Sequence, residues 1–93
     1  MRLNKHEQTA IKNTILSFDR NSKIVLFGSR ADDTKKGGDI DLLVLSEKLT
    51  FDDKLRILSR LYDELGEQKI DLILAKNKSK PFVKIALETG VYL

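Results

Sequence analysis

The residues best suited to chemistry are three aspartates that lie in or beside apolar stretches. Asp39 and Asp41 open the apolar run 40–45, and Asp71 lies inside a similar run, 70–74. Aspartate is depleted inside strands, so a purely structural role explains Asp41 and Asp71 poorly. Adjacent carboxylates repel each other. A hard cation such as Mg²⁺, which takes carboxylate oxygens as ligands, would offset that repulsion.

The elements that must position these aspartates follow from the apolar pattern. Short apolar runs at 24–27, 40–45 and 70–75 predict buried strands. The polar segment after the first run contains three glycines and predicts a loop. One helical pattern, at 50–65, separates the second and third runs. A strand–helix–strand unit usually places its two strands in parallel within one sheet.

The matched runs predict where the carboxylates meet. Asp39 and Asp41 are two residues apart, so their side chains point the same way from an extended chain. If the strands are parallel neighbours, Asp71 stands level with Asp41. We therefore expect three carboxylates to converge beside the turn that Gly28 and Ser29 form at the end of the first strand.

Three helices are expected around this sheet. The first runs from Asn4 to Phe18, with Asn4 as its cap; Thr50 caps the second, and Pro81 lies in the first turn of the third. The expected buried positions, by helical spacing, are Phe51, Leu55, Leu58, Tyr62 and Leu65 on the second helix and Phe82, Ile85, Ala86 and Thr89 on the third. The fold class is α/β, a small mixed sheet with flanking helices, in a single domain over 1–93.

The ordered set of motifs resembles the nucleotidyltransferase superfamily that includes DNA polymerase beta. That family's pattern is a Gly-Ser turn, an Asp-x-Asp pair and a third Asp on a later strand. This chain offers Gly28-Ser29, Asp39-x-Asp41 and Asp71. Its short length and its last six residues also look like the minimal nucleotidyltransferases that pair with HEPN ribonuclease toxins. The resemblance covers most of the chain, from Ile11 to Leu93.

The resemblance implies a reaction and a cofactor. A nucleotidyltransferase fold of this type would move a nucleoside monophosphate, AMP from ATP, to a hydroxyl. Asp39 and Asp41 would bridge two Mg²⁺ ions, and Asp71 would hold the catalytic ion and help remove the acceptor's proton. Two metal ions stabilise the attacking and leaving oxygens together.

The resemblance also assigns the nucleotide contacts. Gly28 and Ser29 would cradle the β and γ phosphates, and Arg30 is a candidate contact to the triphosphate. A solvated or ion-paired arginine is the alternative for Arg30. Asp32 and Asp33 depart from the family pattern, because extra negative charge is unhelpful beside a triphosphate. The lysines at 35–36 are expected to offset that charge.

The acceptor and the partner come from the resemblance alone. They would be a tyrosine of a HEPN toxin, with this chain acting as its antitoxin. One alternative is a catalytically degenerate antitoxin that neutralises its partner by contact. Another is a small Mg²⁺-dependent phosphohydrolase, with water as the acceptor.

Composition excludes several other classes. The chain has no cysteine and one histidine, so disulfides, zinc–thiolate sites and paired-histidine metal sites are excluded. No apolar run approaches the ~20 residues that a membrane span needs. The polar N-terminus shows no signal peptide, and a cytoplasmic location is expected. A net charge of +3 is a mild excess, so nucleic acid is not expected as a direct ligand.

A second surface is suggested near the C-terminus. Lys76, Lys78, Lys80 and Lys84 cluster around Pro81, and the residues that follow include apolar side chains. One interpretation is a solvated loop and helix start. The other is an apolar patch with a basic rim that docks an acidic partner. A HEPN protein is the expected occupant, and self-association is the alternative.

Overall fold

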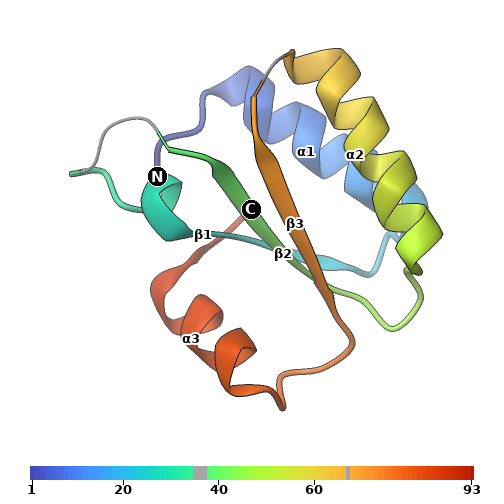
Figure 1. The fold of residues 1–93 in the computed structure, drawn as a ribbon, viewed down its shortest axis with the longest axis vertical. Helices are drawn as coiled ribbons and strands as arrows, with labels where there is room; N and C mark the ends of the chain where they lie inside the picture. Colours follow the sequence, from blue (N-terminus) through green and yellow to red (C-terminus); the bar gives the residue numbers. More distant parts are fainter. Residues whose placement is uncertain (35–37, 67) are drawn as a thin grey trace.

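The computed structural model describes residues 1–34, 38–66 and 68–93. Its four strands form one sheet in the order β3-β2-β1-β4 (Figure 1). Strands β2 and β3 are parallel, whereas β1 is antiparallel to both β2 and β4. The elements are α1 (Lys5–Phe18), β1 (Lys23–Phe27), the 3₁₀ turn η1 (Gly28–Ala31), β2 (Ile40–Leu45), α2 (Phe51–Leu65), β3 (Ile70–Ala75), α3 (Pro81–Thr89) and β4 (Val91–Tyr92). The predicted α/β class and mixed sheet are confirmed.

Local signals in the sequence explain the helix starts. The Asn4 side chain accepts from the backbone N–H of Glu7, whose carboxylate accepts from the backbone N–H of Asn4. Thr50 and Asp53 form the same reciprocal pair at the start of α2. Such capping boxes satisfy backbone donors that the helix leaves unpaired. Pro81 occupies the first turn of α3, where a missing N–H costs little.

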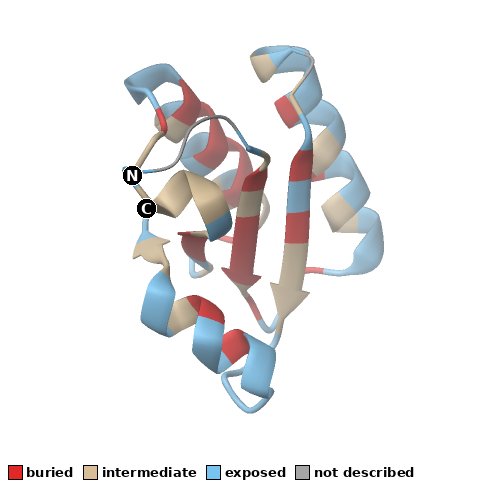
Figure 2. Ribbon diagram, turned by 60° about the vertical axis from the view of Figure 1, so that its left-hand side comes forward, coloured by how far each residue is buried: buried red, intermediate tan, exposed pale blue. Residues whose placement is uncertain are grey.

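The sheet separates two cores of unequal size. Helices α1 and α2 cover one face, where the larger core forms around Ile11, Ile15, Ile57 and Leu61 (Figures 1 and 2). On the other face α3 packs mainly on β1 and η1, around Val25, Leu43, Val83 and Ala86. The short α3 therefore leaves β3 only partly covered on that face, with Asp71 exposed. In the described ranges, no helix is long and apolar enough to cross a membrane.

The predicted buried face of α2 is partly wrong. Phe51 is 66% exposed and Leu55 is 50% exposed, whereas Ile57 and Leu61 are fully buried. Tyr62 is 41% exposed, and its hydroxyl donates to the backbone carbonyl of Ile70. Helix α2 packs against α1 as well as the sheet, and this pairing turns Ile57 and Leu61 inward. Leu58 and Leu65 remain at the edge of the core.

The predicted buried face of α3 is also partly wrong. Ala86 is buried as expected, but Val83 is its buried companion. Phe82 and Ile85 are 48% and 59% exposed, and Thr89 is exposed. Phe82 nevertheless makes an edge-to-face contact with Phe27, with 5.6 Å between ring centroids. The expected apolar side chains after Pro81 thus reach the surface.

Candidate active site

Strand pairing places two carboxylates side by side at the beginning of β2 and β3. Parallel register sets Asp41 directly opposite Asp71, as the matched sequence runs predicted. On the other side, antiparallel register sets Asp41 opposite Phe27, so the turn at Gly28 follows immediately. Ile40 and Leu42 point into the larger core, which directs Asp41 to the face that α3 leaves open.

The surroundings of the Asp41 carboxyl disfavour its ionised form. Burial raises the pKa of Asp41, and the neighbouring Asp71 raises it further through like charge and a side-chain hydrogen bond. Asp39 adds a smaller repulsion, and Lys69 acts in the opposite direction. Asp71 is exposed, so the pair combines one partly buried carboxyl with one that solvent reaches. Two such groups favour a bound proton or cation between them.

The turn after β1 fits closely around this pair. Gly28 has φ +71°, and a Cβ on it would overlap Oδ2 of Asp41. Gly38 has φ +90°, and a Cβ there would overlap Oγ of Ser29. Glycine is therefore needed at both positions for its backbone angle and for space. The backbone at Gly28 therefore lies against the Asp41 carboxylate, and the backbone at Gly38 lies against the Ser29 hydroxyl.

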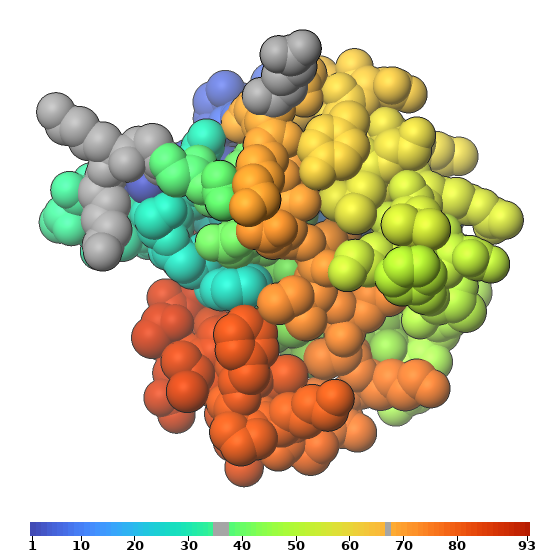
Figure 3. All heavy atoms as spheres, in the orientation of Figure 1, coloured from blue at the N-terminus to red at the C-terminus, as the bar shows by residue number. Residues whose placement is uncertain are grey.

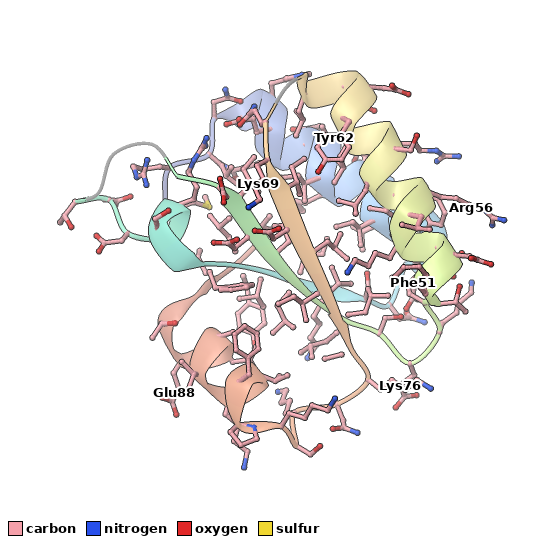
Figure 4. All side chains as sticks on the ribbon, in the orientation of Figure 1. Phe51, Arg56, Tyr62, Lys69, Lys76 and Glu88 are labelled. Atoms are coloured by element: carbon pink, nitrogen blue, oxygen red, sulfur yellow. The ribbon has the colours of Figure 1, made fainter. Side chains whose placement is uncertain are left out.

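Asp39 lies beside the pair but has a different partner. Its Oδ2 is 3.6 Å from Nζ of Lys69, which precedes β3. Figure 4 shows Lys69 at this end of the sheet. Within residues 1–34, 38–66 and 68–93, no three acidic or histidine side chains are grouped as a metal site. The structure therefore brings Asp41 and Asp71 together and leaves Asp39 with a lysine.

Arg30 is engaged within the protein. Its guanidinium donates to the carbonyls of Gly38 and Arg2 at 3.2 and 3.0 Å and to Oε1 of Gln68 at 3.2 Å. It also lies 3.9 Å from the Glu7 carboxylate, and its side chain is only 17% exposed. The ion-paired alternative describes this arrangement. Arg30 ties η1 to the loop before β2 and to α1.

Asp32 and Asp33, the two residues that depart from the family pattern, both have partners within the protein. The Asp32 carboxylate accepts from the backbone N–H and the hydroxyl of Thr34, at 2.9 and 2.6 Å. Asp33 forms an ion pair with the N-terminal amine of Met1. The lysines at 35–36 lie outside the described residues. Part of the added negative charge is thus neutralised by the chain terminus.

Two hollows flank the carboxylate pair. One, of about 430 Å³, is lined by Asp41, Asp71 and Lys54 among others. The second, of about 790 Å³, is lined by Gly28, Ser29 and the loop as far as Thr34. Such volumes are in the usual range of small-molecule sites. A ligand reaching across Gly28 would touch the turn and the carboxylates together.

Two lysines of this site were not found from the sequence. Lys69 faces Asp39, and Lys54 from α2 reaches the hollow of Asp41 and Asp71. Lys69 directly precedes β3 and lies two residues before Asp71, so an extended chain at this point would place both side chains on the same face. Nothing in the helical pattern of α2 distinguishes Lys54 from a solvated lysine.

Comparison with known proteins agrees with this geometry. A family model described as polymerase beta nucleotidyltransferase matches residues 9–93. A search of curated proteins finds no match. The matched region contains the Gly28 turn and all three aspartates. The chain belongs to the polymerase beta nucleotidyltransferase family.

Proposed function

We propose that this chain transfers AMP from ATP to a hydroxyl of a partner protein, with a tyrosine as the acceptor. The observation that carries the proposal is the pairing of Asp41 with Asp71 directly beside Gly28. Membership of the nucleotidyltransferase family supports the general reaction. ATP, the tyrosine and the partner are the parts that experiment must test.

The donor set fits Mg²⁺. Asp41 and Asp71 offer carboxylate oxygens that form no ion pair with the described residues, and burial leaves Asp41 short of solvent. Asp39 would join them by rotating away from Lys69, to which it is bound only at the surface. Hard cations such as Mg²⁺ bind preferentially to carboxylate oxygens. When bound, two Mg²⁺ ions would stabilise negative charge on the attacking and leaving oxygens.

The chain's own groups would orient the reactants and take the proton. The acceptor oxygen forms a bond to the α-phosphorus, the bond to the bridging oxygen of the β-phosphate breaks, and pyrophosphate leaves. Asp71 takes the hydroxyl proton and, being exposed, can release it to water. Gly28 and Ser29 would hold the triphosphate in the hollow that they line.

We further propose that the partner is a HEPN-type toxin and that this chain is its antitoxin. The support is the resemblance to minimal nucleotidyltransferases that pair with such toxins. The acceptor would then bring its own surface to the open face of the sheet.

Labelling with [α-³²P]ATP tests the reaction. The purified chain is incubated with Mg²⁺ and the protein encoded beside it, and the products are separated. Labelled partner together with pyrophosphate supports transfer to protein. Free AMP and pyrophosphate, with no labelled protein, would instead support the phosphohydrolase alternative. If neither labelled protein nor free AMP forms, both reactions are contradicted.

Neutralisation by contact alone is a second candidate, favoured by two observations. Arg30 is occupied by protein groups, and Asp39 is bound to Lys69. A degenerate site could keep both contacts permanently. Asp41→Asn and Asp71→Asn variants that still bind and neutralise the partner would support this candidate. Loss of neutralisation with binding intact would support catalysis.

A further inference from the structure

A groove lies at the opposite end of the sheet from the carboxylate pair. It joins two adjoining hollows of about 480 and 530 Å³, which share Ser46, Glu47, Lys48 and Lys76 in their walls. Figure 4 shows Lys76 at the end of β3 and Phe51 at the start of α2, on the same side of the molecule. The groove is thus basic toward one end and apolar toward the other.

The basic end is rich in exposed lysines. Lys23, Lys48, Lys76 and Lys78 line the first hollow. Among the described residues, no carboxylate forms an ion pair with any of them. The buried Asp19 carboxylate faces Ser46, whose hydroxyl donates to it at 2.5 Å. The lysines therefore present a net positive surface to an approaching molecule.

The apolar end combines one large exposed side chain, Phe51, with partly buried side chains of β3. Phe51 lies at the mouth of the second hollow together with Ile73, Leu74 and Ala75 from β3. Lys54 holds its amine 5.9 Å from the centre of the Phe51 ring. A ligand that fits both ends needs negative charge and an apolar group.

The edge of β3 supplies a third feature. Backbone N–H groups of Ile40 and Ser46 donate to the carbonyls of Lys69 and Ala75, so odd-numbered residues of β3 face β2. By alternation, the backbone of Leu72 and Leu74 faces the outer edge of the sheet. Figure 3 shows β3 at the molecular surface between α2 and α3. An extended chain can pair with such an edge.

We propose that the groove binds an extended acidic segment of a protein partner. Its backbone would pair with the outer edge of β3, its carboxylates would face Lys48 and Lys76, and an apolar side chain would cover Phe51. Strand addition gives affinity through the backbone, and side-chain pockets give specificity. A nucleic acid would gain from the lysines but would leave the strand edge and the apolar wall unused.

The groove also leads toward the carboxylates. Lys54 and Ile73 line both its apolar end and the hollow that contains Asp41 and Asp71. A segment paired along β3 would extend to Asp71 on the same strand. If the proposed transfer is correct, the docked segment would present the acceptor hydroxyl; the binding itself does not depend on that reaction.

Fluorescence anisotropy tests the binding without nucleotide. The probe is a labelled peptide that alternates glutamate with leucine and phenylalanine. A peptide with lysine in place of glutamate and a labelled oligothymidine serve as comparisons. Amide chemical shifts of the ¹⁵N-labelled protein then locate each bound probe. We expect the acidic peptide to bind and to shift Leu72, Leu74 and Lys76.

Charge reversal separates a specific site from general attraction. Lys48→Glu/Lys76→Glu should weaken binding of the acidic peptide about tenfold, because two carboxylate contacts become repulsive. Lys5→Glu/Lys12→Glu makes the same charge change on α1 and should alter affinity less than about twofold. Phe51→Ala should weaken binding about threefold, whereas Ile85→Ala, at a similarly exposed position on α3, should not.

Three results would overturn the proposal. They are no binding of the acidic peptide, equal losses from the two reversal pairs, and tighter binding of oligothymidine to the same amides. Asp71→Asn should bind the peptide as the natural chain does. Unchanged transfer by Asp71→Asn, with peptide binding intact, would therefore count against the proposed reaction and leave the groove in place.

Discussion

Two aspartates at opposite ends of β2 show how differently this small protein treats a carboxylate. Asp41 is the second residue of the strand, and burial and the neighbouring Asp71 raise its pKa. Asp19 packs against the far end, where Ser46 follows the strand. The hydrogen bond from Ser46, and lesser contributions from Asn21 and Lys48, lower the pKa of Asp19 despite its burial.

The contrast distinguishes a structural carboxylate from one available for ligands. Asp19 accepts bonds from the Ser46 hydroxyl and from the backbone N–H of Asn21, so its charge stabilises the fold. Asp41 has another carboxylate as its neighbour, so its charge costs stability unless something binds. Perturbation of this second kind is concentrated at functional sites.

The largest expected effect is loss of transfer on removing a carboxylate of the pair. Asp41→Asn and Asp71→Asn should each lower AMP transfer at least about 100-fold. Each variant removes a ligand of the cation, and Asp71→Asn also removes the base for the acceptor hydroxyl. Both should keep or increase thermal stability, since the repulsion is relieved. Label transfer and thermal melting measure the two effects.

Asp63→Asn is the matched control, because Asp63 is an exposed acid on α2. It should change neither transfer nor melting. Unfolding of both pair variants would show that Asp41 and Asp71 are structural residues and would remove the distinction from Asp19. Asp39→Asn should also reduce transfer, and its loss should free Lys69 without unfolding the chain.

A smaller effect is expected from alanine at Gly28. Gly28→Ala and Gly66→Ala both force a side chain into a positive φ and should each cost about 1–2 kcal/mol of stability. Only at Gly28 does the new Cβ displace the Asp41 carboxylate; nothing lies near Gly66. Transfer should fall about 100-fold in Gly28→Ala, because misplaced catalytic groups cost that much.

Equal transfer by the two glycine variants would contradict the close packing of the turn on Asp41. Urea denaturation provides the stability values, so that activity is compared at equal folded fractions. This pair of variants tests geometry at the carboxylate site without changing its charge.

Alanine at the structural aspartate should act on stability alone. Asp19→Ala removes two hydrogen bonds to a buried charge and should cost about 2 kcal/mol. Nucleotide binding should be unchanged in the folded fraction. Ser46→Ala should reproduce part of the loss. If Asp19→Ala leaves stability unchanged but impairs nucleotide binding, Asp19 is a binding residue and its structural role is contradicted.

The smallest effect is a difference between two pH windows. The lowered pKa of Asp19 contributes stability above the ordinary value of 3.8, which is lost as pH falls below it. The raised pKa of Asp41 acts oppositely: stability rises as pH falls toward 3.8, because the folded state takes up the proton first. Denaturation between pH 3 and 7 measures the free energy of unfolding against pH. Asp41→Asn should reduce its pH dependence above 3.8, and Asp19→Asn should reduce it below 3.8.

Features set by local signals could be predicted from the sequence. The capping residues Asn4 and Thr50, the strands and the parallel register of Asp41 with Asp71 are all as predicted. Each depends on short-range patterns or on the repeated Ile-Asp-Leu run. The Asp41–Asp71 pair could be predicted to the same extent, because strand alternation and register alone place these two residues.

Features set by packing between elements could not be predicted. The apolar arc of α2 is wider than the sheet and α1 can cover, and nothing local indicates that Ile57 lies inside and Phe51 outside. Likewise, the partners of Arg30 are far away in sequence, at Arg2 and Gln68. The ion pair of Asp39 with Lys69 depends on two loops meeting.

The most direct test of the central claim is binding of a non-hydrolysable ATP analogue by isothermal titration calorimetry, with Mg²⁺ in excess. The natural chain should bind it, and removal of Mg²⁺ should abolish binding. Asp41→Asn and Asp71→Asn should each weaken binding at least about tenfold, and Asp63→Asn should not. Unchanged affinity in both pair variants would contradict the claim that these two carboxylates form the nucleotide site.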